Sequence, residues 1–168
     1  MKWVTREFVH VDRTACPWLI KRFIDPDAEF IFAPDEEIPK IVEEGAIPFD
    51  VKGVKLGHRD GKCSFETIIE EYNLDDPILE KIAKIVHAAD LRDYSETPEG
   101  ALLDIIMTGI RYNSKDDYEA VEKASIVYDA LYTYYKLENL REKYKDELEK
   151  MNRKEQKLFL YRKLWETP

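Results

Sequence analysis

Two short segments of the chain hold side chains of the kinds that bind transition metals. Residues 58–66 and 87–90 together contain two of the three histidines and one of the two cysteines. Imidazole, thiolate and carboxylate groups are the ligands that zinc, iron and manganese take in proteins. We therefore expect one divalent metal ion with three or four ligands drawn from five candidates: His58, Cys63, Glu66, His87 and Asp90.

Each segment also has an ordinary structural interpretation. Cys63 could be a small buried side chain and Glu66 a helix-start acid, with His58 on a surface loop. His87 could face solvent, with Asp90 near the end of the same helix. Against this, Cys63 comes just before a helix, where backbone N–H groups favour a thiolate. The metal interpretation requires the two segments to meet in space, which the sequence alone does not show.

A third segment, residues 12–18, carries an acid, a base and a cysteine at a predicted junction of strand and helix. Ligands of α/β proteins bind where strands end and helices begin. Arg13 beside free helix N–H groups would suit an oxyanion, and Asp12 would line the same pocket. The alternative is a polar Asp12–Arg13 network that closes the junction, with Trp18 in the core.

Together these groups suggest a reaction site, if there is turnover at all. An open position on the metal would activate water or bind an oxyanion, with Glu66 or Asp90 as general base. A thiol could reduce a bound oxidising anion. The candidate catalytic residues are Glu66, Cys16 and Arg13, and the candidate ligand-binding residues are Asp12 and Arg13. We find no Gly-rich phosphate loop, nucleophile elbow or nucleotide fingerprint.

The first sixty residues alternate between strand and helix signals. Strands are predicted at residues 8–12, 28–33 and 46–51, the last at an edge or beginning at Pro48. Helices are predicted from Pro17, with Cys16 as N-cap, and at residues 36–44. His10 then lies in the middle of a strand and is not expected to be a ligand. This order predicts a small, mainly parallel sheet.

The remainder of the chain is predicted to be helical. Helix starts are indicated at Ser64, at Asp76-Pro77 and at Thr97-Pro98, and a fourth helix is expected over residues 116–137. The fold class is therefore α+β, a sheet of about three strands followed by a helical bundle. We expect one domain over residues 1–137, divided into 1–60 and 61–137. Residues 138–168 form a helical tail that packs on the domain or links a homo-oligomer.

Composition argues against several functions. The 35 acidic and 26 basic residues give a net charge of -9, which disfavours direct nucleic-acid binding by this chain alone. Two cysteines are too few for a disulfide scaffold and favour a reducing compartment. There is no apolar signal core and no run long enough to span a membrane. We expect a cytoplasmic protein without a membrane partner.

At these motifs the chain resembles the chromate-resistance protein family, specifically its ChrB-type C-terminal domain. The most specific match is the run Asp12–Ile20, and the likeness extends from about residue 3 to residue 135. The other matching stretches are Trp3–Arg6, Val11–Pro26, Ala28–Phe32, Pro48–Val51, Cys63–Glu66 with His58, and Ile85–Asp90.

The resemblance implies a part in bacterial and archaeal chromate resistance, as a chromate-responsive regulator or an accessory protein. Together with the candidate ligands it suggests a metal-dependent domain that handles chromate or another small oxyanion. The alternative is a sensing module that binds chromate or a metal without turnover. A third possibility is an interaction scaffold, in which His58, Cys63 and His87 lie far apart.

Overall fold

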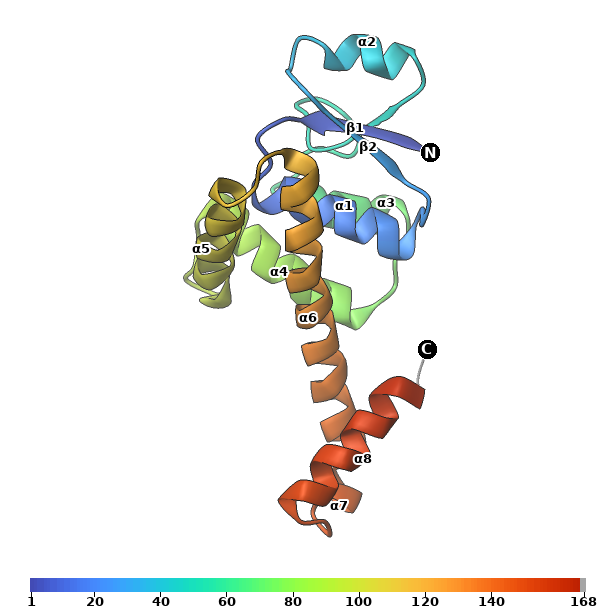
Figure 1. Ribbon diagram of the computed structural model, residues 1–168, viewed down its shortest axis with the longest axis vertical. Helices are drawn as coiled ribbons and strands as arrows, with labels where there is room; N and C mark the ends of the chain where they lie inside the picture. Colours follow the sequence, from blue (N-terminus) through green and yellow to red (C-terminus); the bar gives the residue numbers. More distant parts are fainter. Residues whose placement is uncertain (167–168) are drawn as a thin grey trace. The chain divides into compact units, whose positions relative to one another are not determined.

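The computed structural model describes residues 1–166 of the chain, which form three strands and eight helices. Figure 1 shows their arrangement. In chain order the elements are β1 (Lys2–Arg6), α1 (Val11–Phe23), β2 (Glu29–Ala33), α2 (Ile38–Glu43), β3 (Ile47–Pro48), α3 (Ser64–Glu71), α4 (Pro77–Leu91), α5 (Glu99–Tyr112), α6 (Asp117–Lys143), α7 (Lys145–Leu148) and α8 (Arg153–Glu166).

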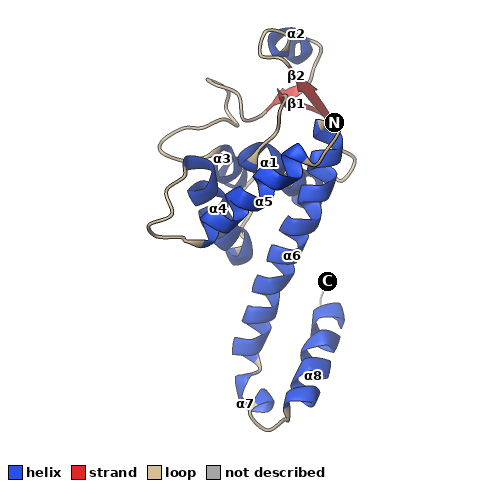
Figure 2. Cartoon of the chain, turned by 60° about the vertical axis from the view of Figure 1, so that its left-hand side comes forward, coloured by secondary structure: helices blue, strands red, loops and turns tan. Residues whose placement is uncertain are grey.

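The three strands form a parallel sheet in the order β2-β1-β3. In the register, Trp3 of β1 lies opposite Phe30 on one side and Ile47 on the other. Helix α2 covers one face of this sheet, and α1 and α3 lie on the other face in both views (Figures 1 and 2). The predicted β-α-β-α-β order, the parallel sheet and the helix-dominated α+β class are confirmed, with β3 short and at an edge, as Pro48 suggested.

The prediction for residues 8–17 is wrong. The first strand is β1, and α1 already begins at Val11, so Cys16 is a buried residue inside the helix and not its N-cap. Pro17 also lies inside α1, where its ring removes one backbone hydrogen bond without ending the helix. The apolar run at 8–11 could not extend β1, because Phe8 adopts a left-handed backbone conformation with φ of 58°.

His10 accordingly is not in a strand. It is the N-cap residue of α1, and its Nε2 lies 3.1 Å from the Asp104 carboxylate and 3.1 Å from the Thr108 hydroxyl. Burial lowers the pKa of His10, and the nearby Asp104 carboxylate opposes that effect. His10 therefore ties the start of α1 to α5.

The helix-start signals after residue 60 are largely confirmed. Asp76 caps α4 by accepting a hydrogen bond of 2.8 Å from the Ile78 N–H, with Pro77 as the first helical residue. α5 begins at Glu99, as Thr97-Pro98 indicated. α3 begins one residue earlier than predicted, because Cys63 and not Ser64 is the N-cap. α6 extends to Lys143, beyond the predicted end at residue 137.

Contacts divide the chain into two units, one from Met1 to Tyr128 and one from Asp129 onward. The core of the first contains Trp18, which stacks on Phe65 with ring centroids 6.3 Å apart and also contacts Tyr128. These aromatic residues fix α1 against α3 and the beginning of α6. The packing also holds in place the N-terminal ends of α1 and α3, where the candidate site lies.

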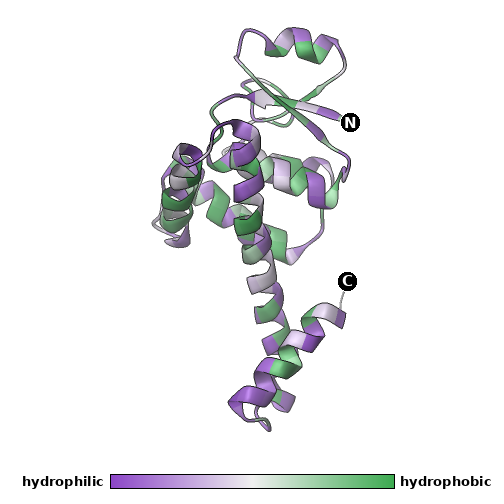
Figure 3. Cartoon of the chain, viewed as in Figure 1, coloured by the Kyte–Doolittle hydropathy of each residue, from purple (hydrophilic) through white to green (hydrophobic). Residues whose placement is uncertain are grey.

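The second unit has an apolar cluster of its own. Its buried members are Leu140, Leu148 and Leu160, one from each of α6, α7 and α8. Within residues 1–166 no helix is both long enough and apolar enough to span a membrane. The longest helix, α6, is not apolar enough because it carries hydrophilic residues along its length (Figure 3).

Candidate metal centre

The first turn of α3 is where the candidate residues gather. Asp12, from the first turn of α1, accepts the backbone N–H of Ser64 at 2.6 Å and that of Phe65 at 2.9 Å. Only 2% of the Asp12 side chain is exposed. A carboxylate here satisfies two N–H groups that the helix leaves unpaired, and it interacts favourably with the helix dipole. Asp12 therefore joins α1 to α3.

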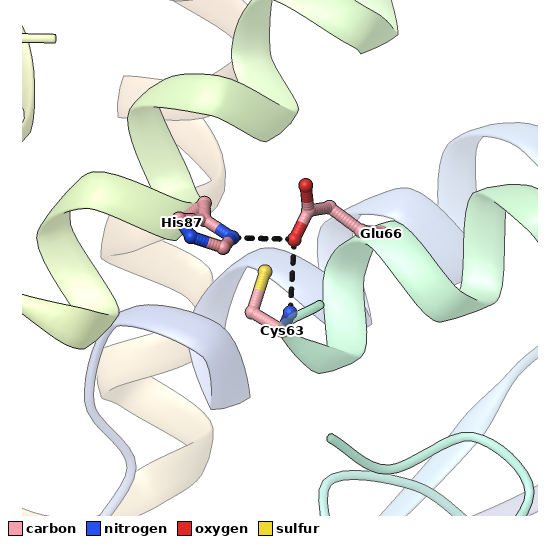
Figure 4. A group of neighbouring side chains, drawn as sticks. All are labelled: Cys63, Glu66 and His87. Carbon is pink, nitrogen blue, oxygen red and sulfur yellow. Dashed lines mark hydrogen bonds and ion pairs between the residues drawn. The ribbon is translucent and has the colours of Figure 1, made fainter. Parts of the chain in front are cut away.

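The first group of candidate ligands, which we call the Cys63 group, consists of Cys63, Glu66 and His87. Glu66 accepts the Cys63 backbone N–H at 2.9 Å, and the same oxygen lies 2.6 Å from His87 Nδ1. Figure 4 shows the imidazole from α4, the carboxylate from α3 and the Cys63 sulfur directed toward one another. One ligand atom from each residue lies within 4.8 Å of the other two.

The Cys63 group opens onto solvent on one side. Cys63 is buried, whereas the side chains of Glu66 and His87 are 25% and 32% exposed. Both line a cavity of about 430 Å³ that also contacts Lys84, Asp93 and Glu96. A metal ion held by the three donors would therefore have protein on one side and room for a small ligand on the other.

Burial opposes the thiolate that the sequence suggested at Cys63. Burial raises the pKa of the Cys63 thiol, and the charge of Asp12 adds to the effect. Two of the N–H groups at the start of α3, those of Ser64 and Phe65, are donated to Asp12. The Glu66 backbone N–H is directed at the Cys63 sulfur, and it lowers the pKa of the thiol without outweighing burial. Burial therefore favours the neutral thiol of Cys63, and a metal ion that binds the sulfur would displace its proton.

A second group, which we call the His58 group, consists of Asp12, Asp50, His58 and Asp90. The His58 Nε2 atom lies 3.1 Å from Asp12 Oδ2, 3.2 Å from Asp50 Oδ1 and 3.3 Å from Asp90 Oδ2. Asp12 and Asp50 are buried and Asp90 is 20% exposed, while 43% of the His58 side chain is exposed. The histidine therefore closes a carboxylate-lined recess from the solvent side.

The charges in the His58 group are strongly coupled. Hydrogen bonds to Asp12 and Asp50 raise the pKa of His58 to about 10. Burial, together with the charges of Asp12 and Asp50, raises the pKa of Asp90 to about 6. Burial also opposes ionisation of Asp50, but hydrogen bonds from His58 and Ser64 outweigh it and the net pKa of Asp50 is lowered.

Arg13 and Cys16 each contact a carboxylate of the His58 group. The Arg13 guanidinium lies 3.7 Å from the Asp50 carboxylate and donates to the Phe8 carbonyl oxygen at 3.3 Å. Cys16 is fully buried and donates its S–H to Asp12 at 3.5 Å, and burial raises its pKa well above the usual value. The partners of Arg13 are therefore Asp50 and the Phe8 carbonyl, whereas Asp12 contacts Cys16 and the start of α3.

The structure thus brings the two predicted segments together but distributes their residues over two groups. Cys63, Glu66 and His87 form one, while His58 and Asp90 join the other. Asp50 was missed by the sequence reasoning. The available signal was its place directly after β3, at the same edge of the parallel sheet as the segment after β1.

Comparison with known protein families shows the class of protein to which the chain belongs. The family described as "ChrB, C-terminal domain" matches residues 3–135, and the chain belongs to it. The expected family resemblance is confirmed over the same part of the chain.

Among curated proteins, the chain is 32% identical over 136 residues to "Protein ChrB" of Cupriavidus metallidurans (strain ATCC 43123 / DSM 2839 / NBRC 102507 / CH34). The aligned region covers 80% of this chain and 40% of the relative, so the chain spans less than half the length of that protein. No solved structure matches the chain.

Proposed function

We propose that this chain is a metal-dependent, oxyanion-handling domain of a chromate-resistance system, with the Cys63 group as its metal ligands. The observation that carries the proposal is the meeting of a buried sulfur with a carboxylate and an imidazole that both line one cavity. Two of these donors come from the start of α3 and the third from α4, so the tertiary fold assembles them.

The donor set fits a zinc-type ion that keeps one position open. Three protein ligands with a water or substrate in the fourth position are typical of catalytic zinc sites, and thiolate, imidazole and carboxylate all occur in them. A metal ion would replace the proton of Cys63 and the proton shared between Glu66 and His87. Glu66 has a second carboxylate oxygen, so its hydrogen bond with the Cys63 backbone can persist.

The cavity next to the Cys63 group supports the oxyanion part of the proposal. Lys84 is the basic residue among its lining side chains, whereas Glu66, Asp93 and Glu96 are acidic. Without a metal ion this excess of carboxylates would repel a dianion such as chromate. A bound divalent ion would reverse the local charge balance. We therefore propose that the anion binds only after the metal, between the open metal position and Lys84.

Metal binding itself is the first test. The Cys63→Ser variant is expected to bind zinc about 100-fold more weakly than the unchanged chain, because it loses the thiolate ligand. Affinity is measured by competition with a chromophoric chelator, together with metal content after purification. Cys16→Ser is the matched control, since it alters the other buried thiol, and its zinc affinity should stay within about threefold. Equal loss in both variants, or no stoichiometric zinc in the unchanged chain, contradicts the proposal.

The anion part is tested separately with Lys84→Gln. Molybdate, a tetrahedral dianion that does not oxidise thiols, is titrated into zinc-loaded protein by calorimetry. Removing one exposed positive charge is expected to weaken binding about fivefold. Lys81→Gln alters another lysine of α4 that does not line the cavity and should bind as the unchanged chain does. Molybdate binding that is the same with and without zinc would rule out the proposed order.

A further inference from the structure

A single nitrogen atom of His58 is surrounded by carboxylates from three different parts of the chain. Asp12 comes from the start of α1, Asp50 follows β3, and Asp90 lies near the end of α4. One oxygen of each lies between 3.1 and 3.3 Å from Nε2. Nothing in the Cys63 group contributes to this arrangement, so it calls for a separate explanation.

Hydrogen bonding alone accounts poorly for the geometry. A ring nitrogen carries one N–H, and a hydrogen bond of that type is about 2.7–3.2 Å long and nearly linear, so the distances alone would allow each contact taken singly. One proton cannot serve three acceptors well. Adjacent ligands of an octahedral ion with bonds of about 2.1–2.2 Å lie about 3.0–3.1 Å apart, and tetrahedral ligands about 3.4–3.6 Å apart. The observed spacings lie in the range of a metal coordination shell.

The surroundings also suit a cation. Asp12 and Asp50 are buried carboxylates, and their ligand atoms and that of His58 all lie within 4.8 Å of one another. A cavity of about 200 Å³ opens beside them, and Asp50 and His58 line it together with Arg6 and Lys52. It provides both an entry path and room for water ligands, which hard divalent ions retain.

We propose that Asp12, Asp50 and His58 form a second metal site, separate from the Cys63 group, with Asp90 on its open side. Carboxylate oxygens outnumber nitrogen here and sulfur is absent, so the site should prefer a hard ion such as Mn²⁺. The ion replaces the imidazole proton of His58 and neutralises the carboxylates that now share it. Because the donors differ, this site can exist whether or not the Cys63 group binds zinc.

The test titrates Mn²⁺ alone into the full chain and follows the electron paramagnetic resonance signal of free Mn²⁺. We expect one bound ion in the unchanged chain and in Cys63→Ser, which removes a ligand of the other group. His58→Gln and Asp50→Asn should each weaken Mn²⁺ binding about tenfold or more. Tryptophan fluorescence and circular dichroism establish that the variants are folded, and the exposed His58 is the safer of the two positions.

A spectroscopic signature separates ligation from a general effect of charge. In the unchanged chain the bound Mn²⁺ should show hyperfine coupling to an imidazole nitrogen, and this coupling should be absent from whatever Mn²⁺ remains bound in His58→Gln. Unchanged Mn²⁺ affinity in His58→Gln, or bound Mn²⁺ without nitrogen coupling, would overturn the proposal. Loss of Mn²⁺ binding in Cys63→Ser with full binding in His58→Gln would assign the ion to the Cys63 group instead.

Discussion

Asp12→Asn is expected to lower the free energy of unfolding by about 3–5 kcal/mol, the cost of breaking a buried charged network. Both carboxylate oxygens are used: one accepts the Phe65 N–H and the other accepts the Ser64 N–H and contacts His58. An asparagine presents an NH₂ group to one of these donors, because it has only one carbonyl oxygen. A buried N–H group would then lose its acceptor.

Urea unfolding in the presence of a chelator measures this loss without interference from bound metal. Asp75→Asn is a matched control, since it makes the same chemical change at an exposed position, and its effect should be within about 0.5 kcal/mol. A further expectation concerns where the damage occurs. The substitution Asp12→Asn should speed up hydrogen exchange of the amides in the first turn of α3 more than that of the amides in α5. If the two variants unfold at the same urea concentration, Asp12 does not have the role in stability described above.

The importance of Asp12 also shows how far sequence reasoning extends in this fold. The helix-start signals Asp76-Pro77 and Thr97-Pro98 predicted the starts of α4 and α5 well, because such residues affect only the backbone of their immediate neighbours in sequence. The segment before α1 was mispredicted for the opposite reason. Its apolar residues suit a strand, but the left-handed conformation of Phe8 turns the chain away from the sheet. That choice depends on tertiary contacts and not on local propensity.

The sequence predicted most of the residues of the candidate site, but not which of them contact one another. The residues after β1 and β3 lie at one edge of a parallel sheet, and this topological rule could have added Asp50 to the candidate list. No local rule reveals that Asp12 of α1 caps α3, a contact that spans 52 residues. That contact places His58 among carboxylates, whereas Glu66 and His87 meet through the packing of α3 on α4.

The His58 group makes a second strong prediction, a loss of stability as the pH rises. The pKa of His58 is raised from 6.5 to about 10 in the folded chain. Below pH 6.5 the imidazole is charged in both the folded and the unfolded state, and the stabilisation by Asp12 and Asp50 is fully present. As the pH rises toward 10 the unfolded chain has already released this proton, so the contribution declines and is lost above the folded-state pKa.

Linkage over so wide a window would correspond to several kcal/mol, but 43% of the His58 side chain is exposed and solvent screens the interaction. We therefore expect about 2 kcal/mol. Asp90 acts in the same direction at lower pH, because its pKa is raised to about 6 and ionisation above that value adds a partly buried charge. For both groups, stability contributed by the bound proton falls as the pH increases.

The comparison that isolates His58 is the difference in unfolding free energy between the unchanged chain and His58→Gln, measured in chelator at constant ionic strength. Lysines, tyrosines and cysteines titrate in both proteins, so their effects largely cancel in the difference. The unchanged chain should be more stable by about 2 kcal/mol at pH 6, and the difference should shrink steadily between pH 6.5 and 10. A difference that stays constant between pH 6.5 and 10 would mean that the surrounding carboxylates do not raise the pKa of His58 in the folded chain.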